Sequence, residues 1–291
     1  MEPKIAALAL AGMVLAGLAY ASTSAGLQQA FAHNFTGDES ANFIANVEKA
    51  KVHLQLADKN LRKSDVALAH VEHARMHFDD HILGEVAEKN KRVATDLGAA
   101  FDKLEGMIGD KAPRADIKKQ IKAVNSLLGE AQSARIDKKF LKDGDVQAIV
   151  MAQMVTEALD AYNRAFGMMM PGEAGSHGNS HGGSSNSMNA TASHSSSGVM
   201  DGHMDQVYDK DAYEVSKAFV TKASGMFSKV KNLAPAGSEE EMAQVKAGLG
   251  KLRTAVNHKE SPDDVAIIVH GQIHENLIKA FDLKLPDDTA T

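Results

Sequence analysis

The chain has 291 residues, of which 44% are hydrophobic; 13 are His, and none is Cys or Trp. Its 32 Lys plus Arg against 38 Asp plus Glu give a formal net charge of −6, which offers no basic footprint for nucleic acid. Without Cys there can be no thiolate zinc site, iron–sulfur cluster or covalently attached haem c, so a metal ion would need His, Asp, Glu or Met ligands.

Residues 1–32 are predicted to be an export signal. A basic residue precedes an Ala-rich apolar run, 5–21, which has the length of a signal-peptide core. A-x-A cleavage patterns end at Ala21 and at Ala32, and cleavage at the second would leave His33 as an N-terminal Cu(II) chelator. The alternative is an uncleaved membrane anchor, since about 17 residues is the lower limit for a span. Either outcome predicts an extracytoplasmic protein.

From Asp38 the pattern predicts an all-α fold. Apolar side chains recur at three- and four-residue steps, no strand pattern is present, and Pro113 has the position of a helix start. Short turns between helices favour an antiparallel bundle over residues 38–167. The expected helices are 42–61, a second one that begins with an N-cap at Ser64-Asp65 and continues to 78, then 80–108, 113–135 and 146–166.

Residues 168–204 consist mainly of Gly, Ser, Asn, His and Met, a composition that predicts a linker because it cannot bury a core. Its His and Met side chains are either soft ligands for copper or nickel or incidental members of a spacer. A second helical unit is expected at 205–285.

That second unit resembles the end of the first. The segment DVQAIVMAQMVTEALDAY, from Asp145, aligns without a gap with DVAIIVHGQIHENLIKAF, from Asp264. A three-helix unit is therefore expected twice, at about 90–166 and 211–281. The sequence leaves open whether the two copies form one bundle or two.

The strongest chemical signal is a histidine stripe in HVEHARMHFDDH. Four of the 13 histidines fall within these twelve residues: His70, His73, His77 and His81. At about 100° per helical residue they share an arc of about 80°, separate from the apolar positions, so the stripe is expected to face solvent or a groove. Four-residue steps continue to Glu85, and this spacing lets neighbouring side chains share a divalent ion.

Two other interpretations of this segment stay open. Histidines on a helix surface can have no ligand role, or they can act as pH-sensitive charges. In addition, Asp79-Asp80 can begin a new helix, which would turn His81 away and leave His70, His73 and His77 together.

A second histidine pair, His270 and His274, has i, i+4 spacing in the last expected helix, where two imidazoles can chelate one ion. Gly271 stands where a zinc protease of the H-E-x-x-H type carries its Glu, so this is not that motif. Met151 and Val155 hold the matching positions in the first copy of the repeat. The helical scaffold thus does not require histidine here, and a buried or interfacial pair is as compatible as a ligand pair.

The segments AFAHNF, ESANFIANVEKAKVHLQLADKNL and HILGEVAEKNKRVATDL resemble a group of secreted helical proteins of ammonia-oxidising archaea, which have no established activity. This resemblance covers about the first 110 residues. The segment LRTAVNHKESPDDV and the Ala-rich helices are more distantly similar to the extracytoplasmic helical region of high-affinity iron permeases, although this chain has a single segment of membrane length. Both resemblances are compatible with an extracytoplasmic role related to metal, and neither assigns ligands.

The sequence therefore predicts an extracytoplasmic protein that binds metal ions for capture, buffering or delivery. Copper is favoured, followed by zinc, nickel or iron, and a membrane transporter or another envelope protein would be a further partner. The alternative is a helical cell-envelope interaction or chaperone-like module without metal. An enzyme is not expected, because the chain has no G-x-S-x-G, no Gly-rich phosphate loop and no zincin motif.

Overall fold

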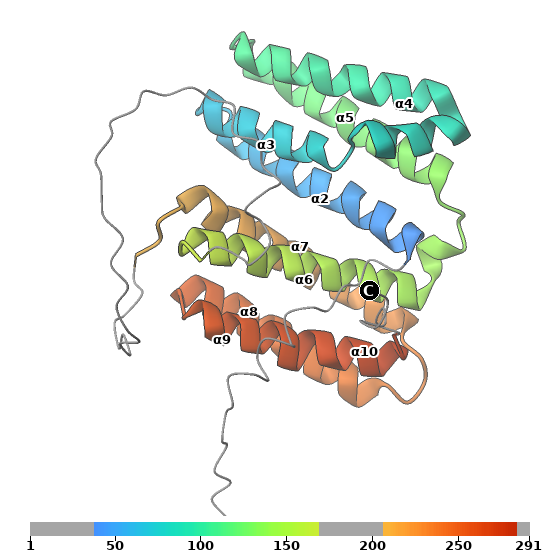
Figure 1. The fold of residues 1–291 in the computed structure, drawn as a ribbon, viewed down its shortest axis with the longest axis vertical. Helices are drawn as coiled ribbons and strands as arrows, with labels where there is room; N and C mark the ends of the chain where they lie inside the picture. The colour runs from blue at the N-terminus through green and yellow to red at the C-terminus, as the bar shows by residue number, and fades with distance from the viewer. Residues whose placement is uncertain (1–37, 169–205, 284–291) are drawn as a thin grey trace, which may run out of the picture. The chain divides into compact units, whose positions relative to one another are not determined.

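A computed structural model describes residues 38–168 and 206–283 (Figure 1). Within these two ranges every regular element is a helix, so the predicted all-α fold is confirmed. The predicted signal segment, His33 and nearly all of the predicted linker lie outside the described residues. Among the residues that are described, no helix combines the length and the apolarity that a membrane crossing requires.

The helical elements follow one another along the chain with short connections. The first described range contains α2 (Glu39–Asn60), α3 (Ser64–Met76), α4 (Asp80–Gly109), α5 (Arg114–Arg135), the 3₁₀ turn η1 (Phe140–Lys142) and α6 (Gly144–Ala165). The second contains α7 (Lys210–Leu233), α8 (Glu239–His258), α9 (Pro262–Ile268), the π-helical segment η2 (Val269–His274) and α10 (Glu275–Phe281). The five helices expected before residue 167 are all present, with ends that differ by at most three residues.

Side chains at the helix starts explain most of these boundaries. Asp38 accepts a hydrogen bond from the backbone N of Ala41 at 2.7 Å, and Asp143 accepts from Asp145 N at 3.0 Å. These caps satisfy amides that a helix leaves unpaired in its first turn. The expected cap of α3 is wrong, because Ser64 is already its first helical residue and Lys63, the residue before it, makes no side-chain cap.

Helix α4 is broken at Asn90. The backbone there is not helical, with φ −154° and ψ 90°, and the Asn90 side chain accepts a hydrogen bond from Val93 N at 3.2 Å. Asn90 thus caps a new helical stretch, at the residue near which the predicted repeat begins. Both repeat ranges contain three successive helical stretches, and the repeat itself stays a prediction.

Helix α2 packs against α3, α5, α6 and α7, while α6 and α7 pack along each other (Figure 1). The buried apolar side chains form one continuous core, which includes Phe43, Phe101 and Phe219. Ser216 on α7 donates to the carbonyl of Ala158 on α6 at 2.7 Å. Segments on the two sides of the predicted linker therefore share this core.

The start of α6 lies close to the end of α7. A Cβ added to Gly144 would lie 2.6 Å from the carbonyl oxygen of Leu233 and 3.0 Å from a ring carbon of Phe281. We expect Gly144→Ala to lower the free energy of unfolding by about 1–3 kcal/mol, because the backbone of α7 must move. The matched change Gly129→Ala, in α5 with nothing within 4 Å of the added atom, should instead stabilise by up to about 1 kcal/mol. Urea denaturation of both variants checks this contrast, which equal effects would contradict.

Candidate metal centre

Three histidines from the neighbouring helices α2 and α3 form a group of candidate metal ligands. One ligand nitrogen each from His53, His70 and His73 lies within 4.8 Å of the other two. Nitrogens that bind one ion at about 2.0–2.1 Å in a tetrahedral site are about 3.3–3.4 Å apart. Inward movements of less than about 1 Å would therefore bring the three imidazoles to bonding distance.

His53 lies at the middle of a larger histidine cluster. Its ring centroid is 5.8 Å from that of His70, 5.2 Å from that of His73 and 5.9 Å from that of His77. Its ring also meets Phe219 of α7 nearly edge to face, at 5.7 Å and 73°. Only 7% of His53 is exposed. The centre of the cluster is therefore buried where α2 meets α3 and α7.

Several ring nitrogens in the group are buried without a hydrogen bond. Nδ1 of His53 and both ring nitrogens of His70 have no such partner among the described protein atoms. Leaving a buried polar atom unsatisfied costs about 1–3 kcal/mol, and a bound ion or water is one way in which such an atom is satisfied. A metal ion would use these lone pairs directly, so the donor set fits a metal ion.

Burial keeps two members of the cluster, His53 and His77, neutral. Burial, followed by the neighbouring imidazoles of His77, His73 and His70, lowers the pKa of His53 to about 2. Burial also lowers the pKa of His77 to about 4. A neutral imidazole is the form that binds metal, so protons do not compete strongly for the rings of His53 and His77 at neutral pH.

A carboxylate from a distant part of the chain reaches the cluster. Oδ1 of Asp211, in the first turn of α7, lies 3.2 Å from Nε2 of His70. The contact with His70 is the main cause that lowers the pKa of the Asp211 carboxyl. Neither nitrogen of His70 has acceptable hydrogen-bond geometry, so this contact is electrostatic and not a hydrogen bond.

The structure corrects the predicted histidine stripe in two ways. His70 is fully buried, so the stripe does not face solvent along its length. Asp79 accepts a hydrogen bond from Ile82 N at 2.9 Å and begins α4, which separates His81 from the cluster. His81 is 80% exposed and lies 3.6 Å from Glu85 Oε1, while Glu85 lies 3.4 Å from the Arg135 guanidinium. The proposed ladder from His73 to Glu85 is therefore interrupted.

His270 and His274 lie at the π-helical segment η2, away from this group. Their ring centroids are 5.4 Å apart, and Nε2 of His274 lies 3.3 Å from the carbonyl oxygen of Ala152 on α6. His274 is 1% exposed, which makes it part of the packing between α6 and η2. Among the described residues, no third donor joins this pair in a group that could hold an ion.

The sequence analysis missed His53 and Asp211. A signal for His53 was present: the turn between α2 and α3 lies near residue 62, so His53 and His70 stand almost equally far from it on opposite arms. In an antiparallel hairpin such residues face each other. Asp211 has no comparable local signal.

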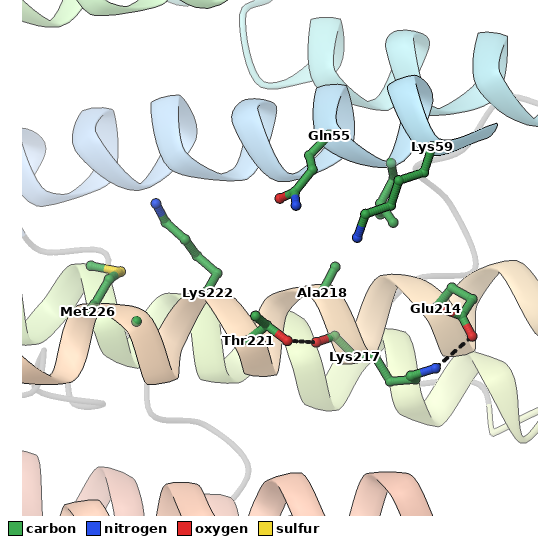
Figure 2. Close-up of a pocket in the computed structure, with 10 residues that line it drawn as sticks. Gln55, Lys59, Glu214, Lys217, Ala218, Thr221, Lys222 and Met226 are labelled. Atoms are coloured by element: carbon green, nitrogen blue, oxygen red, sulfur yellow. Dashed lines mark hydrogen bonds and ion pairs between the residues drawn. The ribbon is translucent and has the colours of Figure 1, made fainter. Parts of the chain in front are cut away.

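A groove between α2 and α7 offers a second candidate site (Figure 2). It has a volume of about 600 Å³ and is lined by Gln55 and Lys59 from α2 and by Lys217 and Lys222 from α7, among others. Lys217 pairs with Glu214 at 2.8 Å and Lys222 pairs with Glu48. Two of the three lysines are thus already neutralised, which weakens the groove as a site for an anion.

No known protein family, curated protein or solved structure matches this chain. The resemblances to archaeal secreted proteins and to iron permeases therefore stay predictions.

Proposed function

We propose that this protein binds a divalent transition-metal ion through His53, His70 and His73. The observation that carries the proposal is the approach of three ring nitrogens to within 4.8 Å of one another, with buried nitrogens that have no hydrogen bond. His77, whose ring is 5.9 Å from that of His53, supports the group from the end of α3. This set replaces the predicted ladder of His73, His77, His81 and Glu85. Its ligands come from two helices, α2 and α3.

The all-imidazole set suits Cu(II), Zn(II) and Ni(II), and among these the intrinsic order of affinity places copper first. The sequence also predicts export. We therefore propose that the protein captures, buffers or delivers the ion outside the cytoplasm, with a membrane transporter or envelope protein as the acceptor. No enzymatic step is part of this proposal.

The test is isothermal titration of the full chain with Cu(II), Zn(II), Ni(II) and Fe(III), beside a variant with His53→Gln, His70→Gln and His73→Gln. Glutamine retains much of the volume and polarity while removing the imidazole. We expect micromolar or tighter binding by the native chain and a loss of at least roughly 100-fold in the variant. The control variant, His81→Gln with His258→Gln, removes two exposed histidines and should bind as the native chain does.

Equal binding by the triple variant would contradict this site, provided that circular dichroism shows the same helix content. The alternative function, a helical interaction module without metal, draws support from the groove between α2 and α7. It predicts no metal uptake by the native chain, together with a partner that is retained by the triple variant and lost when Lys59 and Lys217 are changed to Glu.

A further inference from the structure

We propose that Asp211 of α7 is the fourth ligand of this centre, so that metal binding fastens the first turn of α7 to the hairpin of α2 and α3. This inference rests on the proposed function, since it needs an ion at the histidine group. It goes beyond that function by adding an oxygen donor and a link between segments that stand on opposite sides of residues 169–205.

The distance between Asp211 and His70 fits two ligands of one ion. Two donors that bind at about 2.0–2.1 Å with an angle of about 90–110° at the metal are separated by about 2.9–3.4 Å. Oδ1 of Asp211 and Nε2 of His70 are 3.2 Å apart. The oxygen lies off the axis along which this nitrogen would donate or coordinate, because the contact fails as a hydrogen bond. An ion on that axis would have Asp211 beside it rather than in its way.

The carboxylate of Asp211 is available for this role. Helix α7 is capped by Asp209, whose side chain accepts from the backbone N of Asp211 and of Ala212, so Asp211 is not needed as a cap. Its side chain is 39% exposed and belongs to the first turn of the helix, which leaves it room to rotate. Asp211 is not among the three residues within 4.8 Å of one another, so coordination of a shared ion requires its side chain to rotate toward His53 and His73.

His77 is the rival for the fourth position. It follows the last helical residue of α3, and the charges of Glu157 and Lys49 both act on it. Those two residues form an ion pair of 2.6 Å between α2 and α6. His77 thus interacts with this ion pair as well as with His53, whose ring is 5.9 Å from its own. Asp211 differs in that its Oδ1 lies 3.2 Å from a ring nitrogen of the group.

A fourth donor of this type has two consequences. Three imidazoles with one carboxylate make a closed four-coordinate set that suits Zn(II) or Cu(II), while the hard oxygen disfavours Cu(I). In addition, an ion held from both sides should suppress local opening of the first turn of α7.

The experiment measures Zn(II) affinity and amide hydrogen exchange for the native chain, Asp211→Asn, His77→Gln and Glu214→Gln. Asparagine keeps the shape of Asp211 and removes its charge, and Glu214 is an exposed carboxylate one turn further along α7. We expect Asp211→Asn to weaken Zn(II) binding by roughly 10- to 100-fold. We also expect zinc to slow exchange of the amides at 210–216 in the native chain and in Glu214→Gln, but not in Asp211→Asn.

The possible outcomes separate the two proposals. If the native chain takes up no ion, the proposed function fails and this inference fails with it. If the native chain binds Zn(II) and Asp211→Asn binds equally well, the site stands and Asp211 is not its ligand. A loss confined to His77→Gln would assign the fourth position to His77. If Asp211→Asn changed exchange at 210–216 equally with and without zinc, Asp211 would have a structural role only, which also overturns the inference.

Discussion

Acidification from pH 6.5 to pH 5 is expected to destabilise the metal-free protein by about 2–4 kcal/mol through its buried histidines. The pKa of His53 falls from an ordinary value of 6.5 to about 2 on folding, and that of His77 to about 4. Below pH 6.5 the unfolded chain therefore binds protons that the folded protein does not, and its stability falls as the pH falls. Each such histidine contributes at most about 1.4 kcal/mol per pH unit. The lower end of the expected range allows for the partial exposure of His77.

The pH window separates these histidines from the acidic side chains whose pKa values are lowered. Glu48 and Glu157 have lowered pKa values because lysines face them, although burial acts in the opposite direction. Their stabilising effect is present above the ordinary pKa of 4.5 and is lost only below it. Burial raises the pKa values of Glu105 and Asp145, so their protonation acts in the opposite direction as the pH falls. The difference in slope between the native chain and a variant without His53 therefore isolates the contribution of His53.

Urea denaturation at half-unit steps of pH, with a chelator present, measures this slope. The variant His53→Leu cannot be protonated at this position, so it should lose about half of the native slope. The control variant His258→Gln removes an exposed histidine and should retain the native slope. A slope in His53→Leu equal to the native one would show that His53 is not kept neutral by burial.

The helices could be predicted from local signals because their boundaries depend on neighbours in sequence. Asp38, Pro113 and Asp143 mark helix starts through caps and fixed backbone angles, and the structure places helices directly after them. At Asp79-Asp80 the sequence allowed two outcomes: a histidine ladder that continues to His81, or a new helix that turns His81 away. The structure shows the second, because Asp79 accepts a hydrogen bond from Ile82 N and begins α4.

The histidine group was predicted in part. His70 and His73 were found from their spacing on one helix, but periodicity could not show that His70 is buried, since burial depends on what α3 packs against. His53 belongs to the opposite arm of the hairpin and needed pairing across the turn. Asp211 comes from α7, and the face that α7 turns toward α3 is decided by the contacts of α7 with α6 and α2, which no local pattern contains.

Phe219 is the residue whose loss should affect both the core and the centre. It is fully buried, and its ring meets that of His53 at 5.7 Å. We expect Phe219→Ala to lower the free energy of unfolding of the metal-free protein by about 3–5 kcal/mol, because a cavity replaces the ring. Since the same ring holds His53 in place, Zn(II) affinity should also fall, by roughly tenfold.

The matched change Phe227→Ala separates these two effects. Phe227 lies on the same helix and is only partly buried, so its loss should cost less stability and leave Zn(II) affinity unchanged. Urea denaturation in chelator and titration with Zn(II) supply the two measurements for each variant. If Phe219→Ala lost stability but bound Zn(II) as tightly as the native chain, His53 would be held by α3 alone. The contact of α7 with the histidine group would then be packing without influence on the ion.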